Sequence, residues 1–357
     1  MNVRHHISRV TILMLFFAVT LTSCENETDG PITDQTPISF GKLETRVTDE
    51  LEDNMKAAGF GVFASLSGGP AGTSSAATYS PLMENERVYW TGTKWTYDNT
   101  KVWSSGCFYH FFGYYPHQVS LGDANPVSAV NMNSDGTYKL TFTTPSSADF
   151  DLCAAYTTVD TEELTFNPTQ PVILEFGHEL VNVNLNIWRD HGKHQNDKMR
   201  VTSVALSNIA WKGTLAKTVD GASIWTPLST NPLYSGTNVD PNKEIGAARK
   251  DPNSGTIGET SGTPCQPFGS DGLLLIPKAN SVTLNVAYEL QRENTENPEI
   301  WERHTLPINL PVDTWRSGVK INYNLLLSNE VNLTFYYLGT TVTSWGTPQV
   351  GGTIIIK

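Results

Sequence analysis

Apolar and polar residues alternate with a period of two in several segments of the chain. Between residues 181 and 187, valine, leucine and isoleucine take every second position, and asparagine takes the positions between them. The same alternation recurs over residues 282–288, 321–327 and 331–337. A period of two places the apolar side chains on one face of a β-strand, and such strands are typical of antiparallel sheets that cover a core. The pattern therefore predicts an all-β protein of antiparallel β-sandwiches rather than a parallel α/β fold.

Three shorter signals add detail to this pattern. Ser-Asp-Gly at residues 134–136 separates two strand-like segments, 127–130 and 138–142, and an Asp-Gly pair in this place is typical of a tight hairpin turn. Residues 49–58 carry a helical signal that fits a short helix or an ordered loop. Residues 231–272 are rich in Gly, Pro, Ser and Thr, so we expect a loop-rich insertion that contains short strands.

The length of 357 residues predicts about two domains, because domains average roughly 150 residues. We expect residues 1–23 to form a lipoprotein signal peptide, 24–36 a tether, 37–168 an N-terminal β-sandwich and 169–357 a C-terminal β-sandwich. The boundary falls within residues 167–171, where two prolines among polar residues suit an extended linker.

The start of the chain has the pattern of an export signal. Arg4 and Arg9 give it positive charge, and the apolar run over residues 10–21 is too short to span a membrane as a stable helix. Leu-Thr-Ser-Cys then follows, which resembles a bacterial lipobox. That resemblance implies cleavage after Ser23 and a lipid on Cys24. An ordinary secretory signal with an incidental cysteine is the alternative.

The charge of the chain argues against nucleic acid as a partner. The net charge is −12, and removal of residues 1–23, which hold two arginines and no acidic residue, makes it −14. The basic residues form no stripe that could neutralise phosphates. Residues 25–31 are acidic and lack a large apolar side chain, which indicates a solvated tether. This acidic stretch resembles the surface-export signals of Bacteroidetes lipoproteins, and a plain spacer fits it equally well.

The sequence offers no starting point for catalysis. It lacks G-x-S-x-G, P-loop and H-E-x-x-H motifs. His191 and His194 have no identifiable third metal ligand, and His178 has no identifiable catalytic partner, so we expect it to be a hydrogen-bonded histidine at a strand start. We therefore predict no enzyme, no cofactor and no metal site.

The cysteines and the aromatic residues both allow two interpretations. Cys107 and Cys153 lie in strand-like segments and could form a disulfide, but small buried thiols are the favoured interpretation for both and for Cys265. The aromatic residues between 90 and 103 could form a sugar-stacking surface. Because aromatic side chains also fill sandwich cores, we expect most of them to be buried.

Scattered motifs over nearly the whole chain resemble the fimbrillin family, the pilin-like lipoproteins of Bacteroidales. The motifs, in chain order, are Ile38-Ser39-Phe40, Thr45-Arg46, Phe60-Gly61-Val62-Phe63-Ala64, Trp95-Thr96-Tyr97, Trp103, Phe111-Phe112-Gly113-Tyr114-Tyr115-Pro116, Asp151-Leu152-Cys153-Ala154-Ala155, Phe176-Gly177-His178-Glu179-Leu180-Val181, Leu273-Leu274-Leu275-Ile276-Pro277, residues 315–318 leading into Tyr323, and Val342-Thr343-Ser344-Trp345.

The resemblance implies a fold of two transthyretin-like β-sandwiches in tandem and a mode of assembly. Family members are exported as lipoproteins, and an arginine-specific protease then removes the first strand. The exposed groove accepts a C-terminal strand from the next subunit, so the other partners would be further fimbrial subunits. Arg46, just after the strand candidate at residues 38–43, matches the family's processing position. A solvated loop arginine is the alternative for this residue.

Two C-terminal segments are candidates for the donated strand. An incoming strand must bury alternate apolar residues, and the candidates are Val331, Leu333, Phe335 and Tyr337 in one segment and Ile354 and Ile356 in the other. An ordinary edge strand that closes the second sandwich is the alternative for both.

The function implied is that of a structural subunit of a cell-surface fimbria that supports adhesion. The chain would be held in the outer membrane by the lipid on Cys24. The alternative function is that of a tip adhesin or surface lipoprotein, which would bind a glycan or a host or bacterial surface protein through residues 231–272.

Overall fold

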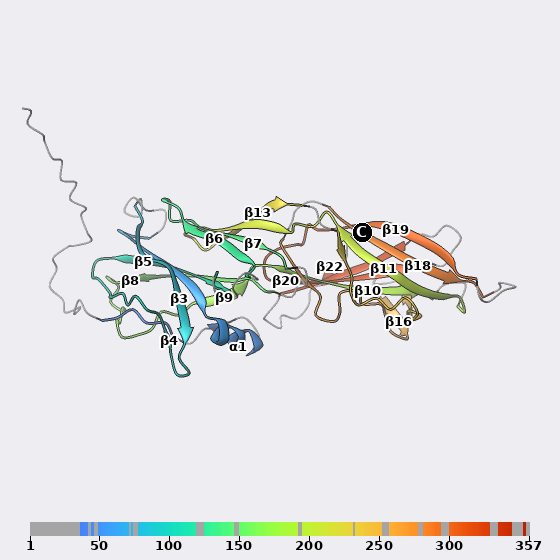
Figure 1. Cartoon of the computed structure of the whole chain (residues 1–357), viewed down its shortest axis with the longest axis horizontal. Helices are drawn as coiled ribbons and strands as arrows, with labels where there is room; N and C mark the ends of the chain where they lie inside the picture. Colours follow the sequence, from blue (N-terminus) through green and yellow to red (C-terminus); the bar gives the residue numbers. More distant parts are fainter. Residues whose placement is uncertain are drawn as a thin grey trace, which may run out of the picture.

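The computed structural model describes residues 36–41, 44–45, 49–70, 73, 78–118, 125–145, 150–191, 195–230, 233–251, 257–277, 281–293, 300–328, 335–344 and 353–354. Over these residues the protein is almost entirely β-sheet, with one short helix, α1 (Asp49–Ala58). The strands gather in two layered groups along the long axis of the molecule (Figure 1). The predicted all-β fold is confirmed, and the segment expected to be a helix or an ordered loop is a helix.

The first group contains a sheet that is buried on both faces. Its strands, in spatial order, are β1 (Glu44–Thr45), β9 (Glu175–His178), β8 (Cys153–Asp160), β5 (Phe108–Tyr115), β2 (Phe60–Ser67), β3 (Ser80–Trp90) and β4 (Trp95–Thr96). In β2, Phe60 and Val62 lie in one apolar cluster and Phe63 lies in another on the opposite face. This double burial explains why β2 and β5 are nearly continuous apolar runs.

The second sheet of this group joins strands from distant parts of the sequence. Its strands, in spatial order, are β6 (Val127–Met132), β7 (Tyr138–Thr143), β12 (Lys212–Lys217) and β13 (Ser223–Ser229). The predicted hairpin is confirmed as β6 and β7, and Gly136 adopts a φ of +79° in its turn. β12 and β13 follow the expected domain boundary, yet β12 pairs with β7 over its whole length. The domain boundary expected at residue 168 stays a prediction, and the pairing of β12 with β7 joins strands from both sides of it.

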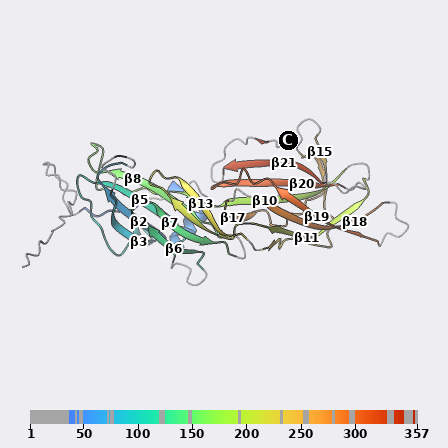
Figure 2. The same ribbon diagram turned by 90° about the horizontal axis from the view of Figure 1, so that it is seen from above.

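The second group packs two sheets around one core (Figure 2). One sheet has the order β16 (Ile257–Ser261), β15 (Ala247–Lys250), β10 (Val181–Asp190), β20 (Val319–Leu327), β21 (Phe335–Ser344) and β22 (Thr353–Ile354), and β17 (Leu273–Leu275) also pairs with β10. The other has the order β14 (Tyr234–Ser235), β11 (Lys198–Ser207), β18 (Val282–Gln291) and β19 (Glu302–Leu310). The short strands β14, β15 and β16 confirm that residues 231–272 are a loop-rich region with strands.

The alternation predicted for β10, β18 and β20 is confirmed by burial. Every second residue of each strand enters the core: Val181, Val183, Leu185, Ile187, Val282, Leu284, Val286, Tyr288, Ile321, Tyr323, Leu325 and Leu327. The polar face of β10 is not open to solvent, because Asn182 Nδ2 donates to the Asp271 carbonyl and Asn184 Nδ2 donates to the Ser270 carbonyl. The chain near residue 270 therefore covers this face.

Most of the strand pairs are antiparallel, but the centre of the second group is not. β10 and β20 run parallel from the pair Val181 and Val319 to the pair Arg189 and Leu327. Parallel neighbours need a crossover connection, and here the chain between them passes through the opposing sheet. β1 pairs with β9 and β15 pairs with β10 in the same parallel sense.

No helix in the described part of the chain is both long enough and apolar enough to cross a membrane.

A small polar network lies inside the first group. His110 is fully buried, and its Nε2 lies 2.8 Å from Ser67 Oγ while its Nδ1 lies 2.6 Å from the Tyr156 hydroxyl. Burial lowers the pKa of His110 from 6.5 to about 4, because the interior disfavours the charged ring. The imidazole is therefore neutral in the folded protein near pH 7.

We predict that His110 makes the protein sensitive to acid. Its pKa is lower in the folded than in the unfolded chain, so the unfolded chain binds more protons between pH 6.5 and about 4. Stability from this group is complete above pH 6.5 and falls as the pH drops through that window. His110→Gln should flatten the plot of unfolding free energy against pH there, measured by urea denaturation. Tyr156→Phe keeps the histidine and should keep the slope, and an unchanged slope in His110→Gln would contradict the prediction.

Candidate functional site

Residues 36–41, the N-terminal segment, lie in the first group as an extended stretch with backbone hydrogen bonds on both sides. On one side, Ile38 N donates to the Lys101 carbonyl at 2.8 Å, and Trp103 N donates to the Thr36 carbonyl at 3.1 Å. On the other side, Val172 N donates to the Ser39 carbonyl at 2.7 Å, and Gly41 N donates to the Val172 carbonyl at 3.0 Å. The backbone of the segment therefore joins two stretches that are far apart in the sequence.

The side chains of this segment alternate between core and solvent. Ile38 and Phe40 are 1% and 5% exposed, whereas Pro37 and Ser39 are exposed. The Phe40 ring meets the rings of Phe60, Tyr97 and Phe111 edge-on, with centroids 6.3, 5.7 and 6.2 Å away. The segment is therefore held by a backbone ladder and by alternate apolar side chains, which are the two elements of strand complementation.

The chain then continues along β9 towards Arg46. Phe40 forms a parallel bridge with Val172, and β1 pairs in parallel with β9, with Thr45 opposite Phe176. Arg46 follows directly and lies outside the described residues, as does the lipidation candidate Cys24. A cavity of about 270 Å³ is lined by Phe166 and by Trp103 and Val172, the two residues whose backbone N–H groups donate to the segment.

The C-terminal donor candidates lie at the edge of the second group. Phe335 and Tyr337 are in β21, opposite Leu327 and Leu325 of β20. Ile354 is in β22, opposite Thr340 of β21. Val331, Leu333 and Ile356 lie outside the described residues. In this structure β21 and β22 thus extend the chain's own sheet, and they lie in the other strand group from residues 36–41 (Figure 1).

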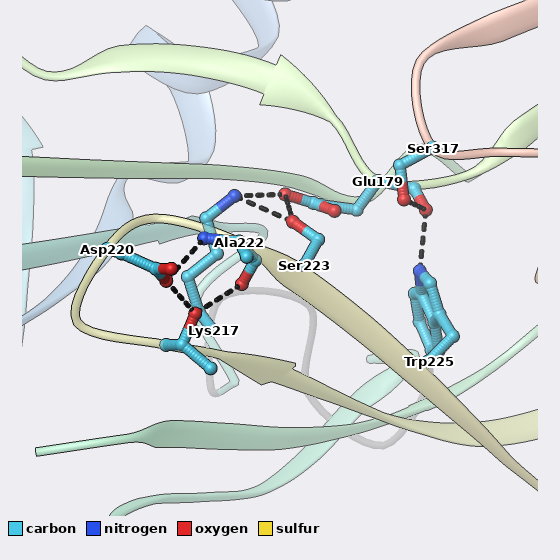
Figure 3. Close-up of polar contacts among 8 residues, drawn as sticks. Glu179, Lys217, Asp220, Ala222, Ser223, Trp225 and Ser317 are labelled. Atoms are coloured by element: carbon cyan, nitrogen blue, oxygen red, sulfur yellow. Dashed lines mark hydrogen bonds and ion pairs between the residues drawn. The ribbon is translucent and has the colours of Figure 1, made fainter.

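A buried polar cluster ties the two strand groups together (Figure 3). Glu179, between β9 and β10, is 3% exposed at its side chain, and Lys217 Nζ of β12 lies 2.9 Å from its Oε1. Ser223 Oγ donates to the same oxygen at 3.0 Å. The Glu179 carbonyl accepts from Trp225 Nε1 of β13 at 2.8 Å and from Ser317 Oγ at 3.0 Å. The β12–β13 hairpin is thereby fixed to the start of β10 and to the turn before β20.

The remaining sequence candidates do not form a catalytic or sugar-binding surface in the described part of the chain. Trp95, Tyr97 and Trp103 are buried in the core, as expected, and Trp90 packs against it. His191 directly follows β10, and His194 lies outside the described residues.

His178 is hydrogen-bonded, as expected, but at the end of a strand rather than at its start. Its Nδ1 lies 2.5 Å from Asp151 Oδ2. Cys107, Cys153 and Cys265 form no disulfide in the described part of the chain, and the first two are buried and the third is partly buried. Cys153 lies beside Asp151 and His178. Sequence reasoning missed this cluster, because His178 meets the other two residues only through the pairing of β8 with β9.

Comparison with known proteins points to one family. A sequence model of the fimbrillin-like family matches residues 45–345. Comparison with curated proteins finds no match. Among solved structures, a fimbrial protein from Bacteroides vulgatus is similar with a TM-score of 0.61 and 20% identity, over 87% of this chain and 99% of that chain.

Two further solved structures have lower scores. A candidate cell adhesion protein from Parabacteroides distasonis has a TM-score of 0.43 and 9% identity, over 87% of this chain and 97% of that chain. One from Bacteroides ovatus has a TM-score of 0.39 and 17% identity, also over 87% and 97%. The fold likeness therefore rests on the Bacteroides vulgatus protein.

We predict that Phe40 anchors the N-terminal segment. Phe40→Ala should lower the free energy of unfolding by about 3–5 kcal/mol, because a buried ring is lost from between three aromatic neighbours. Urea denaturation followed by circular dichroism measures this change. The adjacent Ser39→Ala, at an exposed position, should change stability by less than about 0.5 kcal/mol. Equal effects of the two substitutions would show that the segment is not anchored in this way.

We also predict that Lys217 is needed to neutralise Glu179. Lys217→Met should cost about 3–5 kcal/mol of stability, because it leaves a carboxylate buried without its cation. The double variant Lys217→Met/Glu179→Gln should recover part of the loss in the same denaturation experiment. Lys212→Met, at an exposed position of the same strand, is the matched control. If Lys212→Met costs as much, the ion pair is not the cause.

Proposed function

The chain belongs to the fimbrillin-like family, and on that premise we propose that it is a fimbrial subunit that is processed after an arginine and polymerises by donor-strand exchange. Membership makes it a fimbrial or adhesion subunit of the cell surface that interacts with other fimbrial subunits, and not an enzyme. The processing and the strand exchange are the proposed steps.

Export and anchoring form the first step of the proposal. The signal peptide, residues 1–23, is removed, and Cys24 carries the lipid that holds the chain in the outer membrane. The acidic stretch that follows serves as a solvated tether between the lipid and the first strand group. The sequence motif Leu-Thr-Ser-Cys at residues 21–24 supports this step.

The observation that supports strand exchange most directly is the way in which residues 36–41 bind to the subunit. Cleavage after Arg46 leaves these residues bound to the subunit without a covalent link, by backbone hydrogen bonds, by the Tyr97 hydroxyl that donates to the Ile38 carbonyl, and by the burial of Ile38 and Phe40. Once they depart, the polar backbone groups of Lys101, Trp103 and Val172 and the apolar slot beneath them need a new partner. A strand with alternate apolar residues satisfies both requirements.

The edge of the second group supplies the candidate donor. Among the described residues, β22 is joined to its own sheet by the pairs Thr340 with Ile354 and Thr341 with Thr353, whereas β21 is paired with β20 along most of its length. Release of β22 therefore breaks fewer hydrogen bonds. We favour the segment with Ile354 and Ile356 as the donor over the segment with Val331, Leu333, Phe335 and Tyr337.

The proposal predicts a single processing event followed by assembly. An arginine-specific protease should cut the folded chain, produced from residue 25 onward, once near Arg46, and the product should form filaments visible by negative-stain electron microscopy. Arg46→Lys should resist cleavage and remain monomeric. Removal of residues 353–357 should permit cleavage and abolish filaments.

The outcomes separate the parts of the proposal. Several cuts, or none near Arg46, would overturn the processing step. Filaments formed by the chain that lacks residues 353–357 would exclude the β22 segment as the donor. If the chain that keeps residues 353–357 is cut correctly but forms no filaments, donor-strand assembly is overturned.

A further inference from the structure

A compact group of three different potential metal ligands lies in the first strand group, where β8 pairs with β9. Cys153 begins β8, Asp151 lies two residues before it, and His178 ends β9. The two strands pair so that Cys153 is opposite His178. Cys153 Sγ, His178 Nδ1 and one Asp151 carboxylate oxygen all lie within 4.8 Å of one another.

We propose that Asp151, Cys153 and His178 form a binding site for a divalent transition metal ion, and that Zn²⁺ fits it best. Thiolate, imidazole and carboxylate are the three side-chain ligands that zinc takes in proteins. Mg²⁺ and Ca²⁺ prefer sites made of oxygen ligands alone, so the sulfur ligand argues against them. Three protein ligands with a fourth, solvent position are an established arrangement for zinc.

The spacing of the ligand atoms is close to that of a tetrahedral site. Zinc bonds of roughly 2.0 Å to nitrogen and oxygen and 2.3 Å to sulfur place the ligand atoms about 3.3–3.5 Å apart in a tetrahedron. Cys153 Sγ lies 3.3 Å from Asp151 Oδ2 and 3.8 Å from His178 Nδ1. His178 Nδ1 lies 2.5 Å from Asp151 Oδ2, and this one separation must widen by about 0.8 Å when the ion takes the place of the proton between them, which moves to Nε2 of the neutral ring.

Burial and charge also favour an ion at this position. The side chains of His178 and Asp151 are 3% and 14% exposed, and Cys153 is fully buried. Asp151 Oδ1 is buried and has no hydrogen-bond partner in the described part of the chain, so it is available as a second oxygen ligand. A divalent cation balances the carboxylate and the thiolate, and the thiol proton passes to solvent when the sulfur binds the ion.

The ion would join the start of β8 to the end of β9. β9 is also the strand that pairs with β1, just before the processing candidate Arg46. Because a metal that binds only the folded chain stabilises it, the site would reinforce the sheet edge along which the N-terminal segment runs. The metal site does not depend on processing or on strand exchange.

Cobalt titration of the unprocessed chain from residue 25 onward tests the site. We expect one Co²⁺ to bind per chain, with a thiolate-to-cobalt charge-transfer band and the visible bands of tetrahedral cobalt, and Zn²⁺ to displace it. Cys153→Ser should remove the charge-transfer band and weaken binding at least tenfold. Cys107→Ser, which changes a buried thiol outside the group, should leave the spectrum and the affinity unchanged.

A second measurement, the melting temperature of the parent chain, tests the site without relying on variants that must fold. Zn²⁺ should raise the melting temperature of the parent chain, and a chelator should reverse the rise. Absence of a thiolate band in the parent chain, or a band that survives in Cys153→Ser or disappears in Cys107→Ser, would overturn the site. A melting temperature that does not respond to Zn²⁺ would do so as well.

Discussion

The structure depends on the need to cover both faces of one β-sheet. One face of β2, β5 and β8 packs on the sheet formed by β6, β7, β12 and β13. The other face is covered by irregular pieces, among them α1 and the N-terminal segment. A sheet with an exposed apolar face is unstable in water. The N-terminal segment therefore stabilises the first strand group while it covers this face. If the N-terminal segment departs, the apolar face that it covered is exposed, and another strand must cover it.

The structure also depends on the way in which the two strand groups are connected. A hairpin from the later part of the chain, β12 and β13, completes a sheet that begins with β6 and β7. The buried ion pair between Glu179 and Lys217 lies where this hairpin returns to β10. A buried pair of this kind contributes little net stability, but the loss of either partner leaves the other charge buried without its counterion. The two strand groups are therefore joined by a sheet to which both halves of the chain contribute strands and by a buried ion pair, rather than by a simple linker.

Local signals in the sequence predicted local structure well. The alternation in β10, β18 and β20 and the Asp-Gly turn between β6 and β7 each depend on a few adjacent residues, and the structure has them as expected. Contacts between distant segments could not be read in this way. The pairing of β12 with β7 and the meeting of Asp151 with His178 depend on strand order and register. The asparagines of β10 looked like a solvent-facing row, but the chain near residue 270 covers them. Of the candidate site, the sequence indicated only a strand candidate at residues 38–43; the burial of Ile38 and Phe40 is seen in the structure, and Cys24 and Arg46 stay predictions.

The parallel register of β10 and β20 has a mechanical consequence. The two strands lie side by side along the long axis of the molecule (Figure 2). Tension applied along that axis would load their hydrogen bonds in shear, so that many must break together instead of opening one after another from an end. A pull on the second strand group along this axis would therefore be resisted by the β10–β20 hydrogen bonds acting together.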